Sequence, residues 1–308
     1  MNILITGSTG FIGRHLTNRL LELKKDKVFC LVRNLTKAKP LEDKGANLIY
    51  GDISEKASLK SILDNEIDII FHCAAYVGDD NPELLEKTNV VGTENICELA
   101  CKLKIKRMVY LSSVAVISAN EDVPLTENLP YASKTHYGKS KIEAEKIVLS
   151  YRDKGLPVAI LRPPIVYGED EPHGFKFLLF LIRHRLLPLL NKGKNKFHLV
   201  YVENVVEAMI FALTENQMLE GTYFIADKEI LTSKEVFTIM SQAQKVKPPF
   251  ILPTWLEKIL LFLPFFGRKA RFFLKDKVFS TQRIESIGFN CPYQAQESIF
   301  KSIANFKK

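Results

Sequence analysis

The sequence predicts an α/β fold in which a doubly wound parallel sheet carries a smaller C-terminal lobe. Over residues 1–165, short apolar runs rich in β-branched residues alternate with helical patterns, and strands joined by intervening helices pair in parallel. A glycine-rich turn follows the first apolar run and opens a helix. Beyond residue 165, longer apolar blocks are broken by proline and glycine. The first two observations predict the sheet, and the third predicts the lobe.

The elements follow from these patterns in chain order. Runs of β-branched and aromatic residues bounded by turn residues predict strands, and apolar residues at helical spacing predict helices. The expected strands span 2–6, 27–32, 47–51, 67–73, 107–113 and 157–162. The expected helices span 11–23, 58–64, 89–103 and 134–152, and 198–213 is expected to form a strand and then a helix.

We expect two structural units. Residues 1–165 form the first, and the segment 195–225 is expected to return to it. Residues 166–194 and 226–308 form the second unit. Ligands of such sheets bind at the carboxyl ends of the strands, so the functional residues are expected there.

The composition excludes a small disulfide-stapled module and a disordered tail, because 308 residues with 46% hydrophobic composition bury a sizeable core. The formal charge of +8 would suit a phosphorylated cofactor, nucleic acid or an acidic membrane surface. We expect no nucleic-acid partner. Five cysteines without a CxxC pair, and an N-terminus that already reads as a strand, predict a reduced cytoplasmic protein without a signal peptide or a metal site.

The segment 250–266 is the nearest approach to a membrane segment. Two prolines and the pair Glu257 and Lys258 interrupt it before it reaches the roughly 20 apolar residues that a spanning helix needs. A basic run follows it, namely Arg268, Lys269, Arg271, Lys275 and Lys277. Residues 250–278 would therefore allow peripheral contact with an anionic membrane. The interpretation that we favour is an amphipathic helix covering a substrate pocket.

The turn "TGSTGFIG" predicts a dinucleotide site. It places Gly7, Gly10 and Gly13 between the first strand and the first helix, where a chain turns tightly and approaches a pyrophosphate. Backbone N–H groups at the helix N-terminus then face the phosphates. Thr9, Phe11 and Ile12 belong to the same turn, and we assign all six residues to the cofactor.

The end of the second strand favours NADP(H) over NAD(H). An NAD site usually has an acid here that accepts hydrogen bonds from the ribose 2′-hydroxyl, but the sequence has Val32 and Arg33, with Lys37 close behind. A guanidinium binds a 2′-phosphate in bidentate fashion. NAD(H) remains open, because an acid from elsewhere in the chain would serve it.

A tyrosine and lysine pair in the segment 131–141 is a candidate for proton transfer. Tyrosine needs a nearby cation to act as a base near neutral pH. Tyr137 and Lys141 are four residues apart and share a helix face, which Lys139 does not; Lys134 also approaches that face, whereas Tyr131 directly follows a proline, at or before the start of the helix. The fifth strand ends in two serines, so a hydroxyl would face the same cleft.

Taken together, these motifs resemble the extended short-chain dehydrogenase/reductases, also called the NAD-dependent epimerase/dehydratase family, whose cofactor domain is of the Rossmann type. The resemblance covers nearly the whole chain. It rests on "TGSTGFIG", "GDI" at 51–53, "FHCAA" at 71–75, "TNVVGTEN" at 88–95, "LSSVAV" at 111–116, "YGKSK" at 137–141 and "RPPIVYG" at 162–168.

The resemblance implies roles for individual residues. Tyr137 would be the catalytic acid and base, Lys141 would lower its pKa and bind the nicotinamide ribose, and Ser113 would orient the substrate better than Ser112, which we assign to the cofactor. The remaining cofactor residues implied are Asp52 and Ile53 at the adenine, Ala74 and Ala75 near the ribose and phosphates, Asn89 nearby, and Pro163, Pro164, Ile165 and Val166 at the nicotinamide. His72 and His136 are interpreted as structural. The family often dimerises through the helices containing Cys97 and Tyr137, which implies a homodimer.

Two departures from the nucleotide-sugar epimerases indicate the reaction. The chain has no acid after the second strand and no late arginine-glycine-aspartate element, and it reads "YVENV" at 201–205. This pattern resembles the 3-beta-hydroxysteroid dehydrogenase and dihydroflavonol reductase branch. We expect NAD(P)-dependent interconversion of an alcohol and a ketone on a sterol-, isoprenoid- or flavonoid-like small molecule. A nucleotide-sugar epimerase or dehydratase is the alternative, and a non-enzymatic NADP sensor is a third reading.

Side chains of the second lobe would line an apolar pocket or form its core. The candidates are Phe175, Phe177, Leu178, Phe180, Trp255, Leu256, Leu260, Phe262, Phe265 and Phe266. Alternatively, Arg183, Arg185, Arg268 and Arg271 would bind a diphosphate.

Overall fold

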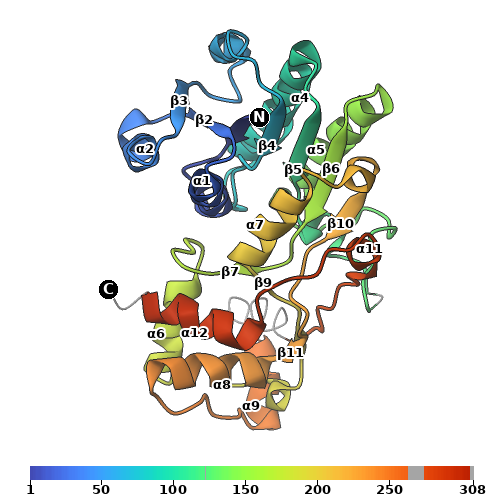
Figure 1. Cartoon of the computed structure of the whole chain (residues 1–308). Coiled ribbons are helices and arrows are strands. Elements are labelled where there is room, and N and C mark those ends of the chain that lie inside the picture. The colour runs from blue at the N-terminus through green and yellow to red at the C-terminus, as the bar shows by residue number, and fades with distance from the viewer. Residues whose placement is uncertain (122, 263–273, 306–308) are drawn as a thin grey trace.

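A seven-stranded parallel sheet forms the centre of the computed structural model, which describes residues 1–121, 123–262 and 274–305. The strand order is β10-β6-β5-β4-β1-β2-β3 (Figure 1). The strands are β1 (Asn2–Thr6), β2 (Lys27–Val32), β3 (Asn47–Tyr50), β4 (Ile69–His72), β5 (Arg107–Leu111), β6 (Val158–Arg162) and β10 (Thr222–Phe224). The predicted fold class is confirmed. The order reverses between β1 and β4, and a crevice for ligands opens at such a point.

Helices cover both faces of this sheet. One face carries α1 (Phe11–Leu23), α2 (Leu35–Glu42), α7 (Val202–Phe211) and α11 (Gln282–Ser286), whereas the other carries the 3-10 helix Lys56–Ile62, α4 (Gly92–Leu103) and α5 (His136–Asp153). The sequence analysis missed α2, which contains Pro40 and has the Asn34 side chain as its N-terminal cap. The short helix α3 (Pro82–Leu85) and the π-helical turn Glu86–Val91 lead into α4.

The C-terminal lobe lies beyond the carboxyl edge of the sheet (Figure 1). It contains α6 (Phe175–Arg183), α8 (Ser233–Gln244), α9 (Thr254–Phe262) and α12 (Ala295–Asn305), with the strand pairs β7 (Val166–Tyr167) and β9 (Val200–Tyr201), and β8 (Lys196–Phe197) and β11 (Leu231–Thr232). Short 3-10 helices span Val114–Ile117, Asn191–Gly193 and Asn216–Glu220. Apolar side chains of α6, α8 and α12 form the core of this lobe.

A segment near the C-terminus, 274–280, joins the lobe to the sheet domain. Backbone hydrogen bonds link Leu125 N to Val278 O and Ser280 N to Leu125 O, both at 2.8 Å. On the other side, Lys277 N donates to Lys196 O at 2.9 Å. Because α7 and β10 pack with the main sheet, the chain crosses between the two units more than once, and we keep the unit boundary near residue 165 as a proposal.

Part of the segment expected to contact a membrane or cover a pocket lies outside the described residues. This applies to Phe265, Phe266, Arg268, Lys269 and Arg271, and to the side chains of Leu260 and Phe262. Within the described part of the chain, no helix is both long and apolar enough to cross a membrane.

Candidate active site

The glycine turn forms a cradle that has no room for side chains. Gly7 has a φ of +73°, and Gly10 N donates to Gly7 O at 2.9 Å. A Cβ added at Gly7 would lie 2.7 Å from Ala74 N, and one added at Gly13 would lie 2.1 Å from Gly7 O. The turn therefore presents bare backbone at the start of α1, which fits the pyrophosphate of a dinucleotide. Thr9 is exposed beside it, and Phe11 and Ile12 are half-buried.

The segment after β4 is held against this turn. Ala74 N donates to Thr6 Oγ1 at 3.3 Å, and Ala75 follows it in the same segment. Asn89 accepts from Tyr76 N at 2.8 Å and donates to Tyr76 O at 3.0 Å. Its amide also donates to Ser140 Oγ of α5 at 3.0 Å. Asn89 thus holds the loop beside the cradle to the helix that carries Tyr137.

The expected adenosine end is built from more exposed side chains. Arg33 is 68% exposed, and its Nη1 lies 3.5 Å from Asp52 Oδ2. Burial alone would raise the pKa of Asp52, but hydrogen bonds from Ser54 and the charge of Arg33 outweigh burial and hold this pKa below its ordinary value. Lys37 is exposed in the first turn of α2, whereas Ile53 is buried and its carbonyl accepts from Asn95 Nδ2 at 2.8 Å.

Ser113 and Tyr137 line one cleft of about 1100 Å³ together with residues 163–166. Ser113 caps the turn after β5, where its Oγ accepts from Ala115 N at 3.1 Å. Burial raises the pKa of Tyr137 to about 12, and a hydrogen bond with Ser113 lowers it in part. The phenol is therefore protonated near neutral pH, which suits a proton donor. The structure brings the predicted hydroxyl pair together with the predicted nicotinamide segment.

Lys141 lies buried beneath these groups. Its Nζ donates to Tyr110 OH at 2.7 Å and to Leu111 O at 2.9 Å. Burial lowers the pKa of Lys141 to about 7, while the charge of Glu145 raises it. Among the hydrogen bonds of the described residues, none joins Lys141 to Tyr137, so the ammonium is held by β5 instead of by the phenol. The sequence analysis did not anticipate Tyr110, although it directly precedes the "LSS" signal.

The other tyrosine and lysine of the motif have different surroundings. Lys134, which spacing left open as a partner for Tyr137, is exposed. Tyr131 OH donates to Glu145 Oε1 at 2.9 Å. His136 is exposed, whereas His72 is buried between Thr6 Oγ1 at 2.7 Å and Thr93 Oγ1 at 3.1 Å, as expected for a structural histidine.

A buried cluster around Glu145 supports the site from below. Arg162 pairs with Glu145, with its Nε at 3.1 Å from Oε1, and both side chains are almost wholly buried. Ser112 Oγ donates to Glu145 Oε2 at 2.5 Å. Ser112 also lines the cleft, but this bond directs its hydroxyl toward Glu145. The sequence analysis missed Glu145, although it lies four residues after Lys141, one turn further along the same helix.

The cleft walls differ from the expected pocket. Leu125, Phe197, Leu199 and Phe279 give the cleft an apolar wall, and its lining lysines are Lys194, Lys275 and Lys277. None of the described candidates from the C-terminal lobe lines the cleft, including Arg183 and Arg185.

The spacing of residues along α6 explains why its aromatic side chains do not line the cleft. Phe175 and Leu179 face the lobe core, which turns Phe177 and Phe180 toward solvent. Trp255 is also exposed, and Leu178 and Leu256 are half-buried. The expectation that these side chains line the substrate pocket is wrong for the described members.

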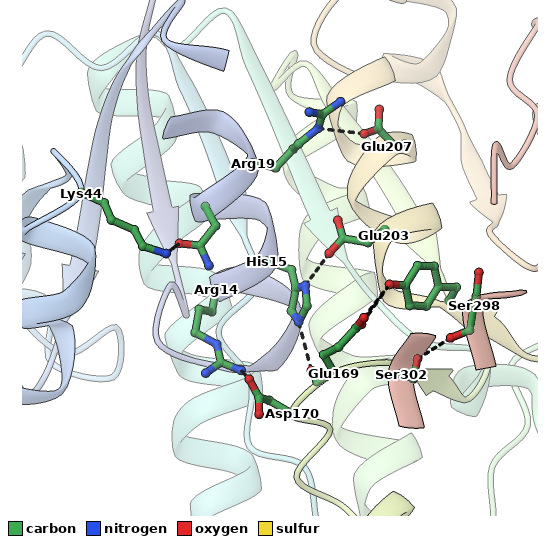
Figure 2. A network of polar contacts seen from close by, with 12 residues as sticks. Arg14, His15, Arg19, Lys44, Glu169, Asp170, Glu203, Glu207, Ser298 and Ser302 are labelled. Atoms are coloured by element: carbon green, nitrogen blue, oxygen red, sulfur yellow. Dashed lines mark hydrogen bonds and ion pairs between the residues drawn. The ribbon is translucent and has the colours of Figure 1, made fainter. Parts of the chain in front are cut away.

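Polar contacts fix the loop that follows the nicotinamide segment (Figure 2). His15 of α1 contacts Glu203 Oε1 of α7 at 2.6 Å through Nδ1 and Glu169 O at 3.1 Å through Nε2. Tyr201 OH donates to Glu169 Oε2 at 2.9 Å, and Arg14 pairs with Asp170 at 3.1 Å. The loop after β7 is thereby tied to the helix that opens at the glycine cradle.

Among the described residues, no group of histidine, cysteine, aspartate and glutamate side chains could hold a metal ion.

Comparison with known proteins agrees with this arrangement. Residues 3–226 match the family model described as the NAD dependent epimerase/dehydratase family. The UDP-glucose 4-epimerase of Vibrio cholerae is 29% identical over 98% of this chain and 94% of its own. The decarboxylating sterol-4-alpha-carboxylate 3-dehydrogenase of Mus musculus is 27% identical over 84% of this chain and 73% of its own. The UDP-glucose 4-epimerase of Thermus thermophilus, solved with NAD, superposes with a TM-score of 0.78 at 24% identity, covering 100% of this chain and 99% of its own.

Proposed function

The chain belongs to the NAD dependent epimerase/dehydratase family and is a nicotinamide-dependent enzyme, and we propose that it interconverts an alcohol and a ketone on a lipophilic small molecule. The observation that carries the proposal is the Ser113 and Tyr137 pair, which lines one cleft with residues 163–166. The apolar side chains of Leu125, Phe197 and Phe279 in the same cleft support a sterol-, isoprenoid- or flavonoid-like substrate. The relatives of the chain include a sterol dehydrogenase and an epimerase. They are therefore compatible with net oxidation or reduction of the substrate, and equally with a reaction that regenerates its own cofactor.

The proposed mechanism assigns one task to each side chain. The bound nicotinamide supplies or accepts the hydride. Tyr137 donates its phenolic proton to the substrate oxygen during reduction and takes it back during oxidation. Ser113 holds the same oxygen by a hydrogen bond. Lys141, anchored by Tyr110 and Leu111, supplies positive charge beneath the site and makes the tyrosinate less costly during oxidation.

Tyr137→Phe tests this assignment. The variant loses the proton donor but keeps the ring, so we expect turnover to fall by about 10²–10⁴-fold while the cofactor Kd stays near that of the wild type. Cofactor binding is measured by nicotinamide fluorescence and turnover by NADPH oxidation with a panel of carbonyl compounds. Turnover close to that of the wild type would refute the role of Tyr137.

We further propose that NADP(H) is preferred, with Arg33 and Lys37 binding the 2′-phosphate. Arg33 is exposed and paired with Asp52 only at 3.5 Å, and such a surface pair is weak enough to rearrange around a phosphate. Arg33→Ala should weaken NADPH binding by about tenfold to a hundredfold, as loss of hydrogen bonds to a charged group predicts, and leave NADH unchanged. Lys39→Ala, which removes an exposed cation elsewhere on α2, is the control. Equal effects on both cofactors would contradict the preference.

A nucleotide-sugar epimerase is the second candidate function. It is favoured by Lys194, Lys275 and Lys277, because these cleft residues would suit a diphosphate. An epimerase recycles its cofactor, whereas a reductase consumes NADPH in proportion to product. Conversion of UDP-glucose without net NADPH consumption would select the epimerase, and stoichiometric NADPH oxidation with a carbonyl compound would select the reductase.

We make two further proposals, one on the oligomeric state and one on the location in the cell. The first is a homodimer formed through α4 and α5, to be tested by sedimentation of the purified chain. The second is a cytoplasmic location, to be tested by cell fractionation.

A further inference from the structure

Helix α6 has two apolar faces, and only one of them is used in the fold. Phe175, Leu179 and Ile182 are buried in the lobe core. Phe177 and Phe180, three residues apart, are 64% and 49% exposed, and their rings stack with centroids 6.5 Å apart. Burying a phenylalanine is worth roughly 1.5–3 kcal/mol, so two solvent-exposed rings side by side are a costly arrangement for a free surface.

Helix α9 adds a second exposed apolar face in the same lobe. Trp255 and Ile259 are one turn apart and are 64% and 53% exposed. The segment before α9 is bonded to the chain that leaves α6, because Leu252 N donates to Leu189 O at 2.9 Å. Asn191 N donates to Glu257 Oε1 of α9 at 2.7 Å.

These contacts link the chain after α6 to α9 and to the segment before it. We call the exposed apolar side chains of these two segments the lobe-end patch, and its members are Phe177, Phe180, Leu186, Phe250, Trp255 and Ile259. In Figure 1, α9 lies at the end of the lobe far from the central sheet, and α6 lies along one side of the lobe next to α12. A large exposed apolar patch rimmed by polar residues marks an interaction site.

Charge indicates the nature of the partner. Residues 175–194 contain five cations and no carboxylate: Lys176, Arg183, Arg185, Lys192 and Lys194. Arg183 and Arg185 are exposed, and no ion pair within the described parts of the chain neutralises either of them. Aromatic anchors beside unneutralised arginines match the interface of a bilayer, where rings insert at headgroup depth and cations meet anionic lipids.

We propose that the lobe-end patch binds the surface of an anionic phospholipid membrane. No described helix is both long and apolar enough to cross a bilayer, and the proposed contact is interfacial, with the apolar faces of α6 and α9 at the level of the headgroups. The proposal stands apart from the reaction proposed above, since neither Phe177, Phe180 nor Trp255 lines the cleft.

The chain supplies its own probe for this contact. It has a single tryptophan, Trp255, which lies within the patch. Vesicles of phosphatidylglycerol and phosphatidylcholine should shift its emission to shorter wavelength, and brominated lipid should quench it. Pure phosphatidylcholine vesicles, or the anionic vesicles at high salt, should give a much smaller response, because screening weakens attraction between exposed charges.

Matched variants separate the patch from general stickiness. Phe177→Ser with Phe180→Ser should weaken co-sedimentation with anionic vesicles by about tenfold or more, and Arg183→Gln with Arg185→Gln should do the same at low salt. Tyr50→Ser with Leu63→Ser removes two comparably exposed apolar side chains from the sheet domain and should leave vesicle binding unchanged. Circular dichroism and Tm establish that each variant is folded.

Three results would overturn the proposal. One is an unchanged Trp255 emission together with no co-sedimentation with anionic vesicles. Another is equal loss of binding in the Tyr50 and Leu63 control. The third is concentration-dependent self-association that the phenylalanine variant abolishes while no vesicles bind, because the patch would then be an interface between copies of the chain.

Discussion

Two carboxylates are buried in this molecule in contrasting ways. Glu145 of α5 is paired with Arg162 at the end of β6, and it also accepts from Ser112 and Tyr131. Asp227, which follows β10, is equally buried. Of the two, only Glu145 has an opposite charge in contact with it.

The groups that hydrogen-bond the Asp227 carboxylate are uncharged. Its Oδ1 accepts from Tyr201 N at 2.9 Å and from Asn204 Nδ2 at 2.7 Å, and its Oδ2 accepts from Tyr167 OH at 2.8 Å. Burial and, to a smaller extent, the nearby charge of Glu229 raise the pKa of Asp227 to about 6, although these hydrogen bonds lower it in part.

The comparison shows that hydrogen bonds alone do not replace a counter-charge in the interior. Neutral donors reduce the cost of burying the Asp227 carboxylate without removing it, so its stabilising effect depends on pH. Glu145 lies one helical turn from Lys141 and bonds Ser112, the neighbour of Ser113. The ion pair thus lies beside the groups proposed for catalysis. The fold places its ion-paired carboxylate near the proposed site and the carboxylate with the raised pKa in the lobe junction.

The largest effect is expected from Glu145→Gln. This change leaves Arg162 buried without its counter-ion, which typically costs about 3–5 kcal/mol of unfolding free energy. Urea unfolding measures the loss. The double variant Glu145→Gln with Arg162→Met should recover part of it, because it removes the stranded charge. A single-variant loss below about 1 kcal/mol would mean that the pair contributes no more than an exposed one.

Asp227→Asn should produce a smaller effect that depends on pH. The folded-state pKa of Asp227 is about 6, above the ordinary value of 3.8, so its contribution is full below pH 3.8 and is lost as pH rises through 6. The stability of the wild type relative to the variant should therefore fall by about 2 kcal/mol between pH 4 and pH 7. Paired urea titrations at several pH values measure this difference. A difference that is constant with pH would show that Asp227 does not titrate in this range.

Two phenol deletions sharpen the same contrast. Tyr131→Phe and Tyr167→Phe each remove one hydrogen bond to a carboxylate, which is worth about 1.5–3 kcal/mol when the acceptor is charged. The cost of Tyr131→Phe, measured at the same two pH values, serves as the reference, because its acceptor Glu145 is ion-paired with Arg162. The cost of Tyr167→Phe should be larger at pH 8 than at pH 5, where Asp227 is mostly protonated. The reverse order would contradict the distinction between the two sites.

The smallest effect is expected at the surface. Lys275 and Glu121 form an ion pair at 2.8 Å across the cleft mouth, but their side chains are 64% and 79% exposed. Glu121→Gln should cost less than about 1 kcal/mol, and added salt should remove the difference in Tm. A cost comparable to that of Glu145→Gln would show that exposure does not account for the contrast.

Local features of the fold and of the site could be predicted from the sequence. The glycine turn, the serines after β5 and the spacing of Tyr137 and Lys141 all lie within short stretches whose geometry is set by one turn or one helix. Glu145 lies on α5 and was missed because its main partner, Arg162, belongs to strand β6, 17 residues further along the chain, and no local pattern joins them. Asp227 was missed for the same reason, since its phenol donor is 60 residues away.

The placement of the aromatic side chains of the C-terminal lobe could not be predicted for a different reason. The sequence shows that α6 is apolar around most of its circumference, but apolar character does not say which side meets the core. Only the packing of α6 against α8 assigns Leu179 inward and Phe180 outward. Phe177, Phe180 and Trp255 of the lobe-end patch, which the sequence analysis had assigned to a pocket or to the lobe core, are exposed instead.

The segment 274–280 follows the other residues of the cleft in the chain, so it is synthesised after them. It contributes Leu274, Lys275, Lys277 and Phe279 to the cleft, and its backbone bonds reach both Leu125 and Lys196. A ribosome releases the cofactor cradle long before it releases this segment. A chain that has not yet reached this segment would contain the glycine cradle but lack one wall of the cleft.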